Sequence, residues 1–132
     1  MIYLLDTNVW VAAHRGNARL DSRIRGVGYD SIMLCAAVIA ELYAGALKSN
    51  KPEQNVAFVN TLLQQYDLLY FGLEEAWHFA KLRAEAESRG VQPGFADLQI
   101  GATAVRHGLV VVTHDVADFS RIGGITLEDW QA

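Results

Sequence analysis

The sequence of 132 residues predicts an α/β domain built around a central, mostly parallel sheet. Short apolar runs alternate along the chain with longer segments of helical periodicity, which is typical of parallel strands joined by helices. The run 109–113 is nearly continuous in valine, as expected of a strand buried on both faces. The length suits one domain, residues 1–132, with a hydrophobic core of its own.

Five short apolar runs are expected to form the strands: 2–5, 31–34, 67–71, 109–113 and 125–127. The first ends where Asp6 interrupts it, and the second leads directly into a helical segment. The last is short and is followed by Trp130, which we expect to anchor the C-terminal end. The main loops are expected over 26–30 and 91–95.

Six helices are expected between these strands: 7–13, 18–25, 36–48, 52–65, 73–88 and 96–107. Asp6 or Thr7 suits the N-cap of the first helix. Pro52 suits the first turn of the fourth, where proline is well tolerated. Gly90 and Gly108 follow the last two helices, and glycine in that place is a typical C-terminal signal.

The net charge of −4 gives no overall basic surface, which argues against nucleic-acid binding on composition alone. Two features weaken that inference. Carboxylates gathered around divalent cations become roughly neutral, and four arginines give one short stretch a local positive charge: Arg15, Arg19, Arg23 and Arg25. Such charges also occur on ordinary solvated helix surfaces.

The cysteine content and the N-terminal segment indicate the compartment. Cys35 is the only cysteine and lies in an apolar run, so we interpret it as a small buried hydrophobic residue rather than a nucleophile. The apolar stretch 2–5 is too short for a signal peptide or a membrane span. We therefore expect a soluble, cytoplasmic protein that does not enter a membrane.

Four acidic residues carry most of the functional information: Asp6, Glu41, Asp97 and Asp115. Asp6 and Asp115 follow two runs that read as buried parallel strands, and ligands of such sheets collect outside the carboxyl ends of the strands. Carboxylates brought together there repel each other unless a cation lies between them. The sequence therefore predicts a site for a hard divalent metal ion.

Each acid also has a plainer explanation. Asp6 and Asp115 suit a turn or an N-cap, and Asp97 suits the first turn of its helix. Glu41 is expected on the shoulder of the buried stripe of its helix, where a lone carboxylate is costly unless it pairs with an arginine or binds a metal. Four acids in four such places are much harder to explain in this way than any one of them.

The motifs around these acids resemble, in order and spacing, those of PIN domains, and most closely the bacterial VapC/FitB toxin ribonucleases. They are LDTN at 5–8, AELYAG at 40–45, DLQIGATA at 97–104, VTHD at 112–115 and DF at 118–119. The resemblance covers essentially the whole chain, including GITLEDW at 124–130. It implies a three-layer α/β/α domain and a Mg²⁺- or Mn²⁺-dependent endoribonuclease with one or two ions. It also implies a toxin that is usually a homodimer, silenced by a small VapB-like antitoxin through which alone operator DNA is bound.

Within this resemblance Asp6, Glu41 and Asp97 match three acids of the family directly. The fourth acid is open: Asp115 continues the strand end and is preferred, and Asp118 is the reserve. Family members often carry Thr-Asn-Asn or Thr-Asn-Asp where this chain has Thr-His-Asp at 113–115, and we assign His114 no role.

The mechanism expected from these residues is hydrolysis of an RNA phosphodiester by activated water. Asp6 and Asp97 are expected to bind the principal ion, and Asp115 to share a second ion or to bind through water. Glu41 is expected to position or deprotonate the attacking water. Three further residues are placed to hydrogen-bond the carboxylates or the phosphate: Thr7, Asn8 and Thr113. Capping of the first helix explains Thr7 and Asn8 equally simply.

Other functions fit less well. A receiver domain requires an aspartate at the end of the middle strand, and the third strand has none there. A phosphatase with an Asp-x-Asp nucleophile fails because Asp6 is followed by Thr7 and Asn8, and no cysteine–histidine cluster suggests zinc. The alternative is a catalytically silent PIN-like protein-binding module. The apolar helices 36–48 and 52–65 favour a groove for an antitoxin helix or a dimer interface, and we expect a dimer.

Overall fold

A computed structural model describes all residues, 1–132. Its sheet has five strands, each parallel to its neighbours, in the order β3-β2-β1-β4-β5. The strands are β1 (Tyr3–Leu5), β2 (Ile32–Cys35), β3 (Asp67–Leu69), β4 (Val110–Val112) and β5 (Thr126–Glu128). The expected sheet is confirmed, and it is entirely rather than mostly parallel.

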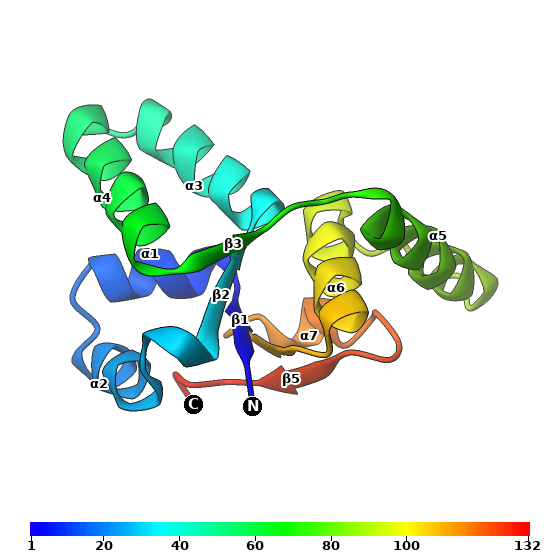
Figure 1. The fold of residues 1–132 in the computed structure, drawn as a ribbon. Helices are drawn as coiled ribbons and strands as arrows, with labels where there is room; N and C mark the ends of the chain where they lie inside the picture. Colours follow the sequence, from blue (N-terminus) through cyan, green and yellow to red (C-terminus); the bar gives the residue numbers. More distant parts are fainter.

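Seven helices surround the sheet: α1 (Thr7–His14), α2 (Ala18–Val27), α3 (Ala36–Lys48), α4 (Pro52–Gln65), α5 (Leu73–Ser88), α6 (Phe95–His107) and α7 (Val116–Phe119). Helices α1, α2 and α4 lie to one side of the sheet, and α5 and α6 lie to the other (Figure 1). The three-layer α/β/α architecture is therefore confirmed.

The structure differs from the expected elements in two places. Residues Tyr29–Ser31 form a 3-10 turn within a segment expected to be mostly loop, and α7 was not expected at all. Each is no longer than about one turn, too short to show a helical repeat in the sequence. The third strand ends at Leu69 rather than at Phe71. Other boundaries agree within one or two residues, which is the usual uncertainty of element ends.

One connected cluster of 25 buried residues forms the core. The central strands supply its middle, because Leu4, Leu5, Val111 and Val112 are completely buried. All three residues of β4 are buried, as expected of a strand covered on both faces. This core fixes β1 and β4 side by side, and their carboxyl ends carry the acids considered below.

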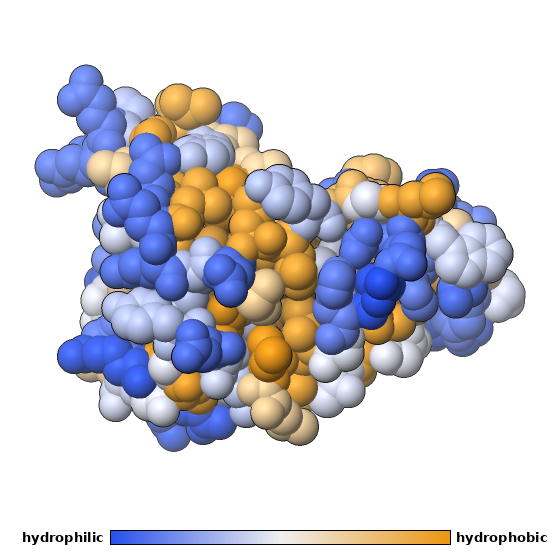
Figure 2. Space-filling model, viewed as in Figure 1, coloured by the Kyte–Doolittle hydropathy of each residue, from blue (hydrophilic) through white to orange (hydrophobic).

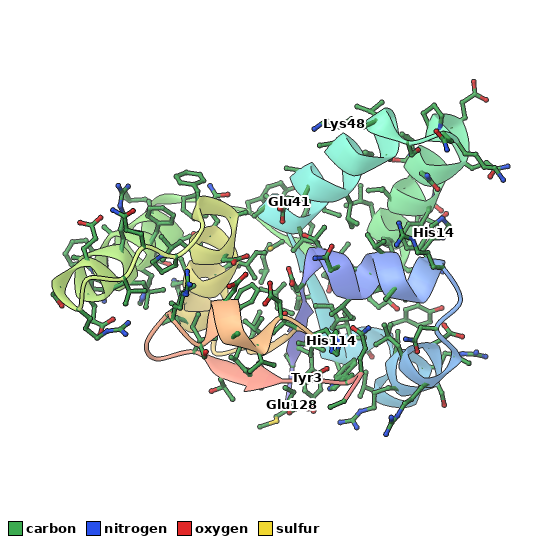
Figure 3. The ribbon with its side chains drawn as sticks, turned by 180° about the vertical axis from the view of Figure 1, so that it is seen from behind. Tyr3, His14, Glu41, Lys48, His114 and Glu128 are labelled. Carbon is green, nitrogen blue, oxygen red and sulfur yellow. The ribbon has the colours of Figure 1, made fainter.

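Helices α3 and α4 project from the body of the protein as an arm, which both ribbon views show (Figures 1 and 3). Tyr43 of α3 donates a hydrogen bond to Asn60 of α4, which links the two helices at their middle. Apolar residues gather in the middle of one face of the molecule, between α4 and α6, with hydrophilic residues on either side (Figure 2). An excess of apolar surface was expected on α3 and α4 themselves, but among their large apolar side chains only Leu47 is exposed.

Two smaller expectations are confirmed. Cys35 is buried at the N-cap of α3, and burial raises the pKa of its thiol to about 11, so the thiol stays protonated. Trp130 is buried, its ring packs edge-on against Tyr3 at 5.0 Å, and the Arg23 guanidinium lies 5.1 Å from the ring centre. None of the helices combines the length and the apolar character that crossing a membrane requires.

Candidate active site

Asp6 occupies the centre of the carboxyl edge of the sheet. It ends β1, caps α1, and is 6% exposed. Its backbone N–H donates to the carbonyl of Val112 at 2.9 Å, so its position is fixed by the pairing of β1 with β4. Its carboxylate accepts the N–H of Thr7 at 2.7 Å and the hydroxyl of Thr113 at 3.1 Å. Both oxygens of this carboxylate are therefore oriented by neighbouring residues.

Two threonines link Asp6 to other acids. Thr113 is completely buried, and its hydroxyl also accepts the backbone N–H of Asp115 at 2.9 Å. The hydroxyl of Thr7 donates to Glu41 at 2.7 Å. Asn8 differs, because it is exposed and makes no hydrogen bond to an acid. The network therefore joins β1, β4 and α3, and it contains two of the three supporting residues expected from the sequence.

Glu41 projects from the first half of α3 (Figure 3). The expectation that it lies on the shoulder of a buried stripe is wrong: Val38 and Leu42 are buried, but Glu41 is exposed. The reason is that α3 belongs to the projecting arm, so only part of its surface meets the core. The expected burial cost does not apply, and no arginine or lysine forms an ion pair with Glu41.

Asp97 lies in the first turn of α6, and Gly94 is the N-cap of that helix. The side chain makes no hydrogen bond that would explain it as a cap. Burial, followed by the negative charges of Asp6, Glu41, Asp118 and Asp115, raises the pKa of Asp97 to about 6. Gly101, one turn further along, is buried close to Ile122 and Ile125, so it permits the close packing expected of this helix.

The fourth position contains two neighbouring acids. Asp115 is the N-cap of α7 and Asp118 lies within that helix; both are exposed. The pKa of Asp115 is raised, chiefly because its side chain shares a hydrogen bond with Asp118. The charge of Asp115 acts on Asp6, whereas on Asp97 the charge of Asp118 acts more strongly. The structure therefore brings both candidates to the same edge, and Asp118 arrives there through the unexpected helix α7.

His114 points away from this group of acids. Its Nδ1 lies 3.1 Å from a carboxylate oxygen of Asp129, just after β5. The contact joins the end of β4 to the C-terminal segment. The sequence analysis did not indicate this pairing, because Asp129 lies 15 residues away, in the segment GITLEDW, to which no site role was assigned.

The pKa of Asp6 is also raised, first by burial, while hydrogen bonds from Thr7 and Thr113 lower it and the charges of Glu41 and Asp115 raise it. None of the five acids at this edge forms an ion pair with a lysine, arginine or histidine. No three acidic, histidine or cysteine side chains already converge on one point as a metal ion requires. The donors themselves fit a hard divalent ion, since all are carboxylates, and Arg121 is the one cation whose charge acts on any of them, on Asp115.

The family model that describes the PIN domain matches residues 3–125 of this chain. That span contains the entire network around Asp6 and all five acids at the sheet edge. The parallel sheet of this chain and the acids at its carboxyl edge are thus those of a PIN domain.

Individual relatives agree with the family match. The chain is 33% identical to Ribonuclease VapC2 of Rickettsia felis, over 98% of both chains. It is 29% identical to the tRNA(fMet)-specific endonuclease VapC of Shigella flexneri, over 97% of both. Among solved structures, VapBC2 of Rickettsia felis bound to a promoter DNA fragment matches with a TM-score of 0.90 and 30% identity, over 98% of this chain and 99% of the other. The chain therefore belongs to the PIN-domain family and groups with its VapC members.

Proposed function

We propose that this protein is a metal-dependent endoribonuclease and the toxin of a VapBC-type toxin–antitoxin pair. The observation that carries the proposal is that five acids without an ion-pair partner lie near one another at the carboxyl edge of the sheet, around Asp6. The curated relatives named above are called ribonucleases or endonucleases, which supports RNA as the substrate.

The residues proposed to hold one or two divalent ions, Mg²⁺ or Mn²⁺, are Asp6, Asp97 and Asp115, with Glu41 nearby and Asp118 in reserve for Asp115. When bound, such an ion activates water and stabilises the charge that develops on the phosphate. The raised pKa of Asp97 supports this assignment, because a cation is what would favour its ionised form.

The chain's own residues supply orientation and a proton acceptor. Thr7 and Thr113 hold the carboxylate of Asp6 from both sides. Thr7 also donates to Oε1 of Glu41, which leaves Oε2 available to accept a proton from the attacking water. We therefore propose Glu41 as the general base and the two threonines as residues that position the acids.

The proposed partners are RNA, a small VapB-like antitoxin and a second copy of the chain. The matched structure from Rickettsia felis is of VapBC2 bound to a promoter DNA fragment, which supports an antitoxin partner and operator DNA as the target of the pair. We propose that this chain reaches the DNA only through its antitoxin. A free, buried cysteine and the absence of a membrane-spanning helix are compatible with the cytoplasmic location we propose.

A homodimer is proposed because large apolar side chains are exposed near the start of α5 and α6: Tyr70, Leu73, Trp77 and Phe95. Leu73 and Trp77 lie one turn apart on α5, so both project from one side of that helix. Light scattering at micromolar concentration is expected to give the mass of a dimer. Replacing both with serine is expected to shift the protein toward monomer, whereas Ile2→Ser, at an exposed apolar residue before β1, is the control. A monomeric wild type would contradict the proposal.

Cleavage of a mixed pool of cellular RNA by the purified protein tests the function. Wild type and Asp6→Asn are compared with Mg²⁺, with Mn²⁺ and with EDTA, and Asp67→Asn at the exposed start of β3 serves as the control. Discrete products are expected only from wild type and the control, and only with a metal. Folded, antitoxin-free protein that cleaves nothing under any condition would instead indicate the catalytically silent binding module.

A further inference from the structure

A pocket of about 550 Å³ lies between α1, α3 and α4, directly beside the acidic edge. Thr7 and Glu41, which belong to the hydrogen-bond network around Asp6, also line this pocket. Its volume falls within the usual range for ligand sites. A substrate strand that leaves the acids on the α1 side must therefore pass into or over it.

Cations without an acidic partner line the same pocket. Five of the eleven lysines and arginines form ion pairs with acids: Arg23, Arg25, Arg83, Arg89 and Arg106. Two of the remaining six, Arg15 and Lys51, line the pocket. In a chain of net charge −4, two unpaired cations beside an acidic site are suited to an anionic ligand such as a phosphate backbone.

An aromatic pair forms part of the pocket wall. The ring of His14 is stacked on Phe58 with centroids 4.0 Å apart and an interplanar angle of 17°. His14 Nε2 lies 3.2 Å from Oδ1 of Asn55, whose amide donates to Ser49 at 2.8 Å. With Asn55 in this orientation, Nε2 is the donor, so the tautomer and the ring plane of His14 are both fixed.

We propose that this pocket binds the single-stranded RNA segment next to the scissile phosphate. Arg15 and Lys51 contact backbone phosphates, and the exposed ring of His14 packs against a base. Figure 3 shows His14 and Glu41 on the same side of the molecule, on α1 and α3. Positive side chains beside an aromatic platform are the usual means of binding single strands without reading their sequence. This inference rests on the proposed ribonuclease function and adds to it the path of the substrate.

The pocket suits RNA better than a helix of a protein partner. Arg15 and Lys51 line it together with amide and hydroxyl side chains, which suit the phosphates and bases of a nucleic-acid strand. A partner helix would fit the same pocket only if it carried acids to pair with these two cations, and the test below distinguishes that outcome.

RNA binding without cleavage tests the proposal. Asp6→Asn serves as the background, and anisotropy of a labelled 12-nucleotide single-stranded RNA of mixed sequence is measured in Mg²⁺ at several salt concentrations. Arg15→Gln and Lys51→Gln are each expected to weaken Kd about five- to tenfold and to reduce the slope of log K against log salt by about 0.7. Lys81→Gln, on α5 beside Trp77, is the matched control and is expected to change neither quantity. His14→Ala is expected to weaken binding, and His14→Phe to retain it.

The outcomes separate this proposal from the proposed function. If Arg15→Gln and Lys51→Gln bind RNA like the control while their thermal melting is unchanged, the pocket is not an RNA site. The same variants losing only co-purification with the antitoxin would assign the pocket to a protein partner and overturn the proposal. Wild type that binds RNA through these residues but never cleaves it would overturn the nuclease and leave the pocket assignment in place.

Discussion

Asp6 and Glu75 are two buried carboxylates, 6% and 7% exposed, whose pKa values are shifted in opposite directions. Burial raises the pKa of both. For Glu75 the effect is more than reversed by hydrogen bonds from its own backbone N–H, from His107 and from the N–H of Gly72. For Asp6 burial remains the largest effect on the pKa: the hydrogen bonds from Thr7 and Thr113 do not reverse it, and the charges of Glu41 and Asp115 add to it. Burial alone therefore does not determine the state of an acid in this protein.

The difference extends to the regions around the two residues. Acids of α5 pair with cations: Glu74 with Arg106 of α6, and Glu85 with Arg89, the C-cap residue of α5. Asp97, at the sheet edge, has only acids as its strongest electrostatic neighbours. In one region acids hold helices together, and in the other they are kept unpaired. We interpret unpaired acids of this kind as the sign of a functional site, and the predictions below test that interpretation.

The largest expected effect is that of Asp97→Asn. If Asp97 belongs to the functional region, RNA cleavage falls on the order of 10³-fold, as when an electrostatic group of an active site is removed. The stability of the same variant is expected to rise. The pKa of Asp97 is about 6 in the folded protein against 3.8 as its ordinary value, so the folded state binds extra protons between about pH 4 and 6. Stability from this residue therefore declines as pH rises through that window.

In EDTA above pH 6, Asp97→Asn is accordingly expected to melt about 3–6 °C higher than wild type. This corresponds to a gain of about 1 kcal/mol in the free energy of unfolding, because solvent screens part of the repulsion between the carboxylates. Near pH 4 the two proteins are expected to melt together. Thermal melting across this pH range makes the comparison. A variant that melts lower than wild type at every pH would show that Asp97 is a structural acid like Glu75.

A second prediction concerns the buried threonines. Thr113→Val removes the hydroxyl that donates to Asp6 and is expected to lower cleavage 10- to 100-fold, the usual effect of losing a group that orients a ligand. Thr103→Val is the matched control, because Thr103 is also buried but donates only to the carbonyl of Gln99 within α6. Equal cleavage by the two variants would show that the hydroxyl of Thr113 does not orient Asp6 for cleavage.

A smaller effect is expected from replacing either of the two exposed acids at α7, Asp115 at its N-cap or Asp118 within it. Asp115→Asn is expected to lower cleavage about tenfold, and Asp118→Asn less, because the charge of Asp115 acts on Asp6. Initial cleavage rates of the two variants, measured at one metal concentration, decide between them. The reverse order would make Asp118 the fourth acid.

Glu75→Gln is expected to leave cleavage unchanged and to lower stability by about 1–3 kcal/mol, because the charged partner of several hydrogen bonds is lost. The pKa of Glu75 is lowered on folding, so its contribution is present above the ordinary value of 4.5 and is lost as pH falls through the folded pKa. Urea unfolding at neutral and at acidic pH measures this difference. If Glu75→Gln lost cleavage but kept its full stability, the division between paired structural acids and unpaired functional acids would be wrong.

The sequence predicted those parts of the fold that follow from repeating patterns. Five strands and six helices came from apolar runs, helical periodicity and caps such as Pro52 and Gly108. Helix α7 was missed because one turn has no repeat, and it is α7 that carries Asp118 to the site. Single-turn elements depend on tertiary contacts, such as those of the buried Phe119, rather than on local pattern.

The site was predictable where a residue follows a buried strand. Asp6 is fixed by the end of β1, so its place at the sheet edge follows from the sequence alone. The exposure of Glu41 was harder to predict, because its position on the helix is the same whether α3 packs in the core or projects as an arm. The pairing of His114 with Asp129 depends on the path of the last residues, which no motif specifies. The role of each acid in catalysis remains a prediction.

The buried thiol of Cys35 has a practical consequence. Because its pKa is about 11 and its side chain is enclosed by the core, the natural chain presents no thiol that thiol-reactive dyes can reach. A cysteine placed at the exposed Ala44 of α3 would then be the only labelled position in an otherwise unaltered protein. A fluorophore attached there would report by energy transfer when a labelled oligonucleotide approaches the projecting arm.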